Sequence, residues 1–219
     1  MFLPLKDENP SDGKPIVTIS LIAVNVAIFA FMYLSGGEFY SAVVYEFGMT
    51  PAYLGAATLH TLFTSMFLHG GIIHLAGNML YLWIFGDNIE SICGKTKFIL
   101  FYLTCGLIAS FTHLLTTVNP EIPTIGASGA IAGVLGAYLL IYPRAKVLTL
   151  VFFFFITMIR VPAVVLLGFW FVYQLFLGSI TLMSGVGTGV AFWAHIGGFA
   201  AGFVLILLFR KMKPRGAII

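Results

Sequence analysis

The chain has 219 residues, of which 60% are hydrophobic and only 9% are charged. A soluble domain of this size cannot bury that much apolar surface, so the composition excludes a soluble globular protein and indicates a polytopic α-helical membrane protein. The formal net charge of +3 does not indicate nucleic-acid binding, because the cations are scattered over four separate segments.

Six apolar segments are long enough to cross about 30 Å of hydrocarbon. We therefore expect an all-α membrane protein with a bundle of six transmembrane helices as one domain over residues 16–209. A polar segment without a cleavable signal, residues 1–15, precedes it, and a basic tail, residues 210–219, follows it. The predicted spans are residues 16–34, 72–92, 97–116, 126–142, 162–179 and 193–209.

One apolar run, residues 147–159, does not fit this scheme. It is too short to cross a bilayer and lies between Lys146 and Arg160. We expect it to be a re-entrant or interfacial segment.

The cations predict the topology of the bundle. Every lysine and arginine lies before the first span, after the sixth, or in or next to the loops at 93–96 and 143–161. The loops at 35–71, 117–125 and 180–192, which alternate with these, contain none. By the positive-inside rule, both termini are then cytoplasmic, and the even number of spans agrees with this pattern.

Four polar side chains lie in or at the ends of predicted spans, where a polar group is costly and is a functional candidate. They are His74, Asn78, Ser128 and His195, and the topology places all four near the outer ends of their helices. A serine needs a base to become a nucleophile, and a neutral histidine is the usual base. Asn78, His74 and backbone N–H groups are suited to stabilise an oxyanion.

Glycines at small-xxx-small spacing allow two of these helices to approach closely. They are Gly129 and Gly133 in the fourth span, and Gly198 and Gly202 in the sixth. Since no carboxylate lies in the outer half of a span, we expect a Ser–His dyad and not a triad.

Three motifs together resemble the rhomboid family of intramembrane serine proteases. HGGIIHLAGN at 69–78 is similar to the H-x4-H-x3-N signature of that family, GASG at 126–129 to G-x-S-G, and AHIGGFAAG at 194–202 to A-H-x-x-G-x-x-x-G. The resemblance covers the second to the sixth span, and the whole looks like the minimal six-span prokaryotic type.

The resemblance implies a role for each matching residue. Ser128 is the expected nucleophile and His195 the expected general base. His74, Asn78 and the Ser128 amide would stabilise the oxyanion. The expected supporting residues are His69, Gly126, Gly129, Gly198 and Gly202.

The resemblance also implies partners and movement. The expected substrates are single-span membrane proteins, cut near the extracytoplasmic face of a prokaryotic plasma (inner) membrane, without cofactor or metal. The fifth span, with Trp170, Phe171 and Phe176, would act as a lateral gate, and the loop at 184–190 would cap the site. Glu90 resembles a residue that fixes the cytoplasmic end of the second span.

Two departures from the family pattern stand out. The segment 35–71 lacks the Trp-Arg pair of many relatives, and Ala132 stands where some relatives have an aromatic residue against the catalytic histidine. Something else must then fix the ring of His195.

Three other readings remain open from the residues alone. A transporter or channel would carry buried carboxylates or broken helices at the midplane, and the sequence shows neither. A non-catalytic rhomboid-like protein that binds membrane clients would be expected to lack Ser128 or His195. A metal site built from His69, His74 and His195 would lack any nearby acidic or thiolate ligand.

Overall fold

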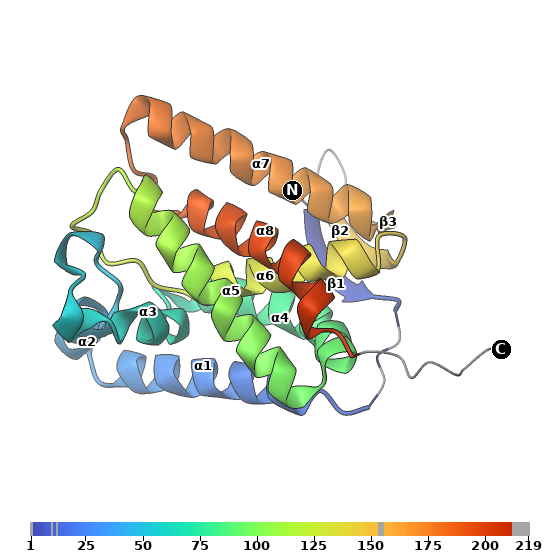
Figure 1. Cartoon of the computed structure of the whole chain (residues 1–219), viewed down its shortest axis with the longest axis horizontal. Coiled ribbons are helices and arrows are strands. Elements are labelled where there is room, and N and C mark those ends of the chain that lie inside the picture. The colour runs from blue at the N-terminus through green and yellow to red at the C-terminus, as the bar shows by residue number, and fades with distance from the viewer. Residues whose placement is uncertain (1, 10, 12, 153–155, 212–219) are drawn as a thin grey trace.

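The computed structural model describes residues 2–9, 11, 13–152 and 156–211. Long helices lie across one another through the body of the molecule, and a small sheet lies at one end (Figure 1). Three short 3-10 helices accompany α2 and α3 at the opposite end. The helices are α1 (Ile16–Leu34), α2 (Gly37–Phe47), α3 (Thr61–Thr64), α4 (Ile72–Cys93), α5 (Lys95–Thr116), α6 (Ser128–Ile141), α7 (Ala163–Ser184) and α8 (Phe192–Phe209), and the strands are β1 (Phe2–Asp7), β2 (Lys146–Phe152) and β3 (Ile156–Pro162).

A helix lies at each of the six segments that the sequence predicts as spans. By length and composition, α1, α5, α7 and α8 are each able to cross a membrane. Helix α4 meets the same test only together with the segment Ala56–Phe67, from which it is bent by 78°. Helix α6 has only 14 residues. The chain is therefore a membrane protein with four or five candidate spans, and the count of six stays a prediction.

The expectation of an all-α protein is wrong at one place. Residues of the apolar run 147–159 form strands β2 and β3, and β1 pairs with β2 to complete an antiparallel sheet of order β1-β2-β3. The run is rich in Val, Thr, Ile and Phe, which favour strands, and its length suits two strands better than one span. Strand β1 lies within the polar segment 1–15, so this segment is part of the fold.

Helices α6 and α8 pack backbone to backbone at the centre of the molecule. A Cβ atom added to Gly198 would overlap the carbonyl oxygen of Gly129, and one added to Gly202 would overlap that of Gly133. Glycine is thus required at both α8 positions by contact alone. Helix α6 is buried from Gly129 to Tyr138. Its apolar side chains therefore pack inside the protein and few of them reach its surface.

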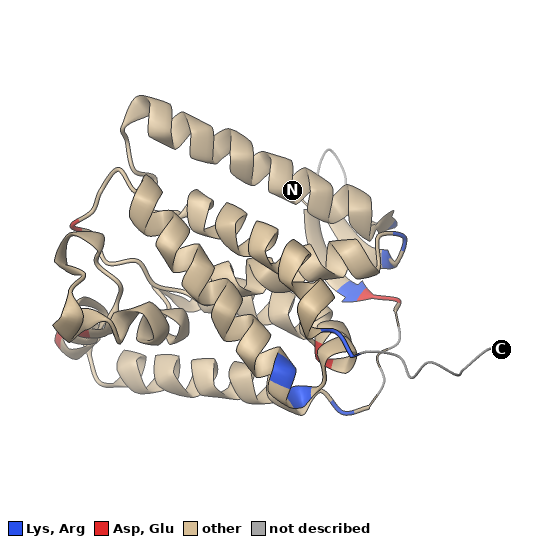
Figure 2. Ribbon diagram, in the orientation of Figure 1, with Lys and Arg blue, Asp and Glu red and all other residues tan. Residues whose placement is uncertain are grey.

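Charge is distributed unequally between the two ends of the molecule. The lysines and arginines of the described residues gather at the end that holds the sheet, and only acidic residues mark the end around α2 and α3 (Figure 2). This separation is the three-dimensional counterpart of the loop pattern in the sequence. Residues 212–219 of the predicted basic tail lie outside the described residues.

Polar contacts at the cation-rich end join distant parts of the chain. The Glu90 carboxylate accepts hydrogen bonds from the Val17 and Thr18 amides at 3.0 and 2.8 Å and so caps the start of α1. The Asp7 carboxylate accepts from the Tyr138 hydroxyl at 2.8 Å and from Nδ2 of Asn88 at 2.9 Å. These bonds tie α1, β1, α4 and α6 together away from the predicted site.

Candidate active site

The segment before Ser128 is fixed by backbone hydrogen bonds. Thr124 forms an isolated antiparallel bridge with Met49, and the Gly126 amide donates to the Ser65 carbonyl at 2.9 Å. Gly126 has a φ of 126°, which L side chains rarely adopt. The chain then enters α6 with Ser128 as its first residue. Its amide therefore belongs to the first turn, whose N–H groups have no intrahelical acceptor.

Ser128 and His195 meet although 67 residues separate them in the sequence. Oγ of Ser128 lies 2.8 Å from Nε2 of His195. The distance follows from the contact of α6 with α8, because the glycines bring the two backbones together within a helical turn of these residues. The geometry thus joins a hydroxyl to a potential base at hydrogen-bond distance.

The second nitrogen of His195 contacts a residue that the sequence analysis missed. Nδ1 lies 2.9 Å from Oε1 of Gln174 on α7, and Gln174 is buried. The ring of Trp170, one turn earlier on α7, lies 5.9 Å from the His195 ring between centroids, at 35°. The rule that singled out Asn78, a polar group within an apolar span, would also have found Gln174.

A hydrogen bond to the His74 ring defines its tautomer. The Gly70 amide donates to Nδ1 of His74 at 3.2 Å, so the proton of the neutral imidazole is on Nε2. The Nε2 edge of the ring faces Gly126, where an added Cβ would lie 2.8 Å from the ring. His74 thus directs an N–H group toward the turn that carries Ser128.

Asn78 lies one helical turn after His74 on α4 and faces the same cavity. It is buried, and its Nδ2 atom has no hydrogen-bond partner among the described residues. A buried amide donor without an acceptor is costly. An acceptor that arrives with a substrate would satisfy it.

His69 is placed differently from the other predicted residues. It is fully buried, and neither ring nitrogen has a partner within the described part of the chain. Its ring packs edge-on against that of His74, with 5.1 Å between centroids, and its carbonyl accepts from the Tyr40 hydroxyl. His69 therefore supports His74 by packing and does not itself line the cavity.

The geometry does not favour a metal site at these histidines. Both ring nitrogens of His195 are engaged, by Ser128 and Gln174, and Nδ1 of His74 accepts from the Gly70 amide. Of the ring nitrogens in these two side chains, only Nε2 of His74 has no hydrogen bond among those described, so the two rings do not both offer a free nitrogen to one metal ion. No group of three metal-ligating side chains occurs among the described residues.

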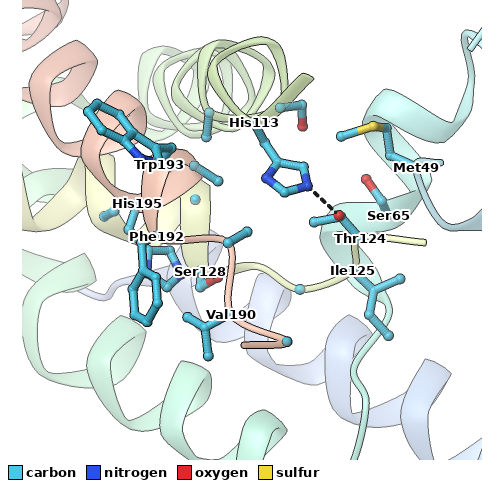
Figure 3. A pocket seen from close by; sticks show the side chains of 18 of the residues that line it. Met49, Ser65, His113, Thr124, Ile125, Ser128, Val190, Phe192, Trp193 and His195 are labelled. Atoms are coloured by element: carbon cyan, nitrogen blue, oxygen red, sulfur yellow. Dashed lines mark hydrogen bonds between the residues drawn. The ribbon is translucent and has the colours of Figure 1, made fainter. Parts of the chain in front are cut away.

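A cavity of about 750 Å³ is lined by His74, Asn78, Ser128 and His195. Figure 3 shows Ser128 and His195 beside Phe192 and Val190 at one side of it, and His113 bonded to Thr124 at the other. Residues 187–190 of the predicted cap loop line it, as does Trp170 of the predicted gate. The ring of His113 contacts Oγ1 of Thr124 at 2.7 Å and so helps hold the segment before Ser128.

Comparison with known proteins agrees with the motifs. The family model described as the rhomboid domain matches residues 56–212. The rhomboid protease GluP of Bacillus subtilis is 36% identical over 129 residues, which are 58% of this chain and 25% of GluP. The human mitochondrial presenilin-associated rhomboid-like protein is 32% identical over 140 residues, 63% of this chain and 36% of that protein.

A further relative resembles the chain over nearly its whole length. YdcA of Bacillus subtilis is 28% identical over 203 residues, which are 92% of each chain. By contrast, the match covers about a quarter of the length of GluP and about a third of that of the human mitochondrial protein.

Proposed function

Because the chain belongs to the rhomboid family, we propose that it is an intramembrane serine endopeptidase that cleaves single-span membrane proteins near the extracytoplasmic face. The observation that carries the proposal is the 2.8 Å contact of Oγ of Ser128 with Nε2 of His195. Relatives that carry the name rhomboid protease support the same activity.

In the first half of the reaction, Oγ of Ser128 attacks the carbonyl carbon of the scissile peptide bond, and Nε2 of His195 takes the hydroxyl proton. The negative charge that develops on the carbonyl oxygen receives hydrogen bonds from Nε2 of His74, Nδ2 of Asn78 and the Ser128 amide. Collapse of this intermediate breaks the C–N bond. The imidazolium gives its proton to the departing amine, and an ester with Ser128 remains.

In the second half, water from the cavity attacks the ester while His195 accepts one of its protons. The second tetrahedral intermediate expels the serine oxygen, which regains its proton from His195. The products are a carboxylic acid and an amine, and the enzyme is unchanged. The same histidine and the same oxyanion donors therefore serve both halves of the reaction.

The proposed substrate must expose an extended peptide bond. A stable helix hides its carbonyls in its own hydrogen bonds, so spans that contain Gly, Pro or other helix-weakening residues near the cut are favoured. The proposed entry lies beside α7, and residues 187–191 would cover the cut from the outer side.

We further propose six spans with both termini in the cytoplasm of a prokaryotic cell, in the plasma membrane. The gathering of Lys and Arg at the sheet end supports this orientation (Figure 2). It would place Ser128, at the start of α6, nearer the outer end. A client-binding rhomboid-like protein without catalysis is the alternative, and the intact contact of Ser128 with His195 disfavours it.

The test is cleavage of a single-span reporter in liposomes that contain the purified protein. We expect Ser128→Ala to abolish cleavage and labelling by a fluorophosphonate, because both require the activated hydroxyl. Ser110→Ala is the matched control, since Ser110 lines the same cavity but is not in the dyad. Cleavage that persists in Ser128→Ala would refute the proposed mechanism, and a wild-type protein that binds the reporter without cutting it would favour the client-binding alternative.

A further inference from the structure

The contact between Gln174 and His195 supplies what the sequence motifs leave open, namely the group that orients the base. Gln174 is only 6% exposed, and its side chain reaches from α7 to the far side of the imidazole from Ser128, with Oε1 2.9 Å from Nδ1. An amide in an apolar helix needs a partner. Among the described residues, the partner it meets is the proposed general base.

We propose that Gln174 is a positioning residue of the catalytic site, which holds His195 in the reactive tautomer. The proposal rests on the proposed function. The carbonyl oxygen of Gln174 accepts a hydrogen bond from Nδ1–H of His195. The neutral ring then carries no proton on Nε2, and this nitrogen is free to accept the hydroxyl proton of Ser128.

The orientation of the amide decides the outcome. If the NH₂ group of Gln174 faced Nδ1 instead, Nδ1 would be the acceptor and Nε2 would carry the ring proton. His195 would then donate to Oγ of Ser128 and would be unable to act as its base. Only the carbonyl-inward orientation is consistent with catalysis, so this orientation is itself testable.

Trp170 completes the arrangement. Residues 170 and 174 lie one turn apart on the same face of α7, and the Trp170 ring packs beside the His195 ring at 5.9 Å. Helix α7 therefore limits the rotation of the His195 ring through Trp170, and through Gln174 it fixes which ring nitrogen carries the proton. This explains how the site is ordered with Ala132 at the α6 position, where an aromatic ring would otherwise lie.

Two substitutions separate positioning from simple packing. Gln174→Met keeps the length and shape of the side chain and removes the acceptor, whereas Gln174→Glu keeps an oxygen acceptor and removes the NH₂ donor. We expect Gln174→Met to lower kcat about tenfold at unchanged KM, because a neutral hydrogen bond of ordinary strength selects the tautomer. We expect Gln174→Glu to retain activity well above that of Gln174→Met.

The measurements are kcat, KM, melting temperature and the rate of fluorophosphonate labelling of Ser128, each normalised to folded protein. Ser179→Ala, a change at an exposed polar residue of the same helix, is the control and should match the wild type. A kcat near wild type in Gln174→Met would overturn the proposal. Activity lower in Gln174→Glu than in Gln174→Met would show that an oxygen acceptor at this position does not support the base, and would overturn the proposal as well.

These outcomes are distinct from a failure of the proposed function. A wild-type protein that neither cleaves the reporter nor reacts with the fluorophosphonate would remove the function and, with it, the role of Gln174. A wild-type protein that does both, together with a Gln174→Met variant that is equally active, would remove only the role of Gln174.

Discussion

Among the residues of the proposed site, Asn78 shows the clearest mismatch between burial and bonding. Its side chain lies in the cavity wall, and its Nδ2 donor has no partner within the described residues. A residue with a purely structural role would use this donor in a hydrogen bond that stabilises the fold. One that serves the reaction keeps the donor free until an oxyanion forms.

Substitution of Asn78 tests this interpretation. We expect Asn78→Ala to lower kcat by about 100-fold, or by about tenfold if His74 and the Ser128 amide compensate, with little change in KM. Since no hydrogen bond of Nδ2 is lost, the melting temperature should stay near that of the wild type. An unchanged kcat combined with a lower melting temperature would assign Asn78 to the fold instead.

At the scale of elements, the contact between α6 and α8 sets the distance between Ser128 and His195. The contact depends on positions where no side chain fits, and Gly202 against the carbonyl of Gly133 is the tightest of them. An added methyl group must push the two helices apart. Because the proposed dyad spans the same pair of helices, we expect stability and cleavage to be coupled through this contact.

Gly202→Ala should therefore lower the melting temperature, at a cost of about 1–3 kcal/mol for an overpacked contact, and should also slow cleavage. Gly168→Ala provides the matched control, because Gly168 on α7 has open space around the position of the added Cβ. There the substitution should be neutral or stabilising by up to about 1 kcal/mol. Equal melting temperatures in the two variants would contradict this account of the helix contact.

On the scale of the whole molecule, the cation-rich end is organised by the N-terminal strand. Strand β1 pairs with β2, and Asp7 at its end bonds Tyr138 on α6 and Asn88 on α4. The first residues of the chain thus join the hairpin between α6 and α7 to the core. Their position opposite the α2 and α3 end gives them a structural role away from the proposed site (Figure 1).

The pH dependence of this end follows from Asp7. Burial is the main cause that raises the pKa of the Asp7 carboxyl above its usual 3.8, against the lowering effect of the Tyr138 hydrogen bond. A raised pKa in the folded state adds stability that is fully present below the unfolded value and is lost as the pH rises through the folded value. The ionised carboxylate is therefore a cost at neutral pH.

We expect Asp7→Asn to melt at a higher temperature than the wild type at neutral pH, because the amide oxygen can still accept from Tyr138 and Asn88 without burying a charge. The difference should shrink as the pH falls through the raised pKa of Asp7, because the wild-type carboxyl then becomes protonated. Melting temperatures of both proteins over this range provide the measurement. A variant that melts lower at neutral pH would show that the charge strengthens these bonds by more than its burial costs.

The sequence by itself determined the membrane class and the positions of the main helices, and it singled out four side chains of the proposed site, His74, Asn78, Ser128 and His195. Hydrophobic segments of fixed length and cations in alternate loops are local properties, and the bilayer gives them a direct meaning. Ser128 and His195 were predictable because a polar group in an apolar helix is rare and because the glycine spacing indicates which helices meet.

Only the tertiary structure decided the sheet and the orientation of the proposed base. Strand pairing between β1 and β2 joins segments about 140 residues apart in the chain, and a short apolar run does not by itself reveal whether it forms strands or an interfacial segment. Gln174 carries no charge and belongs to none of the three motifs, so its contact with His195 appears only once α7 is packed against α8. A hydrogen bond between side chains on different helices depends on their mutual rotation, and packing of the whole bundle fixes that rotation.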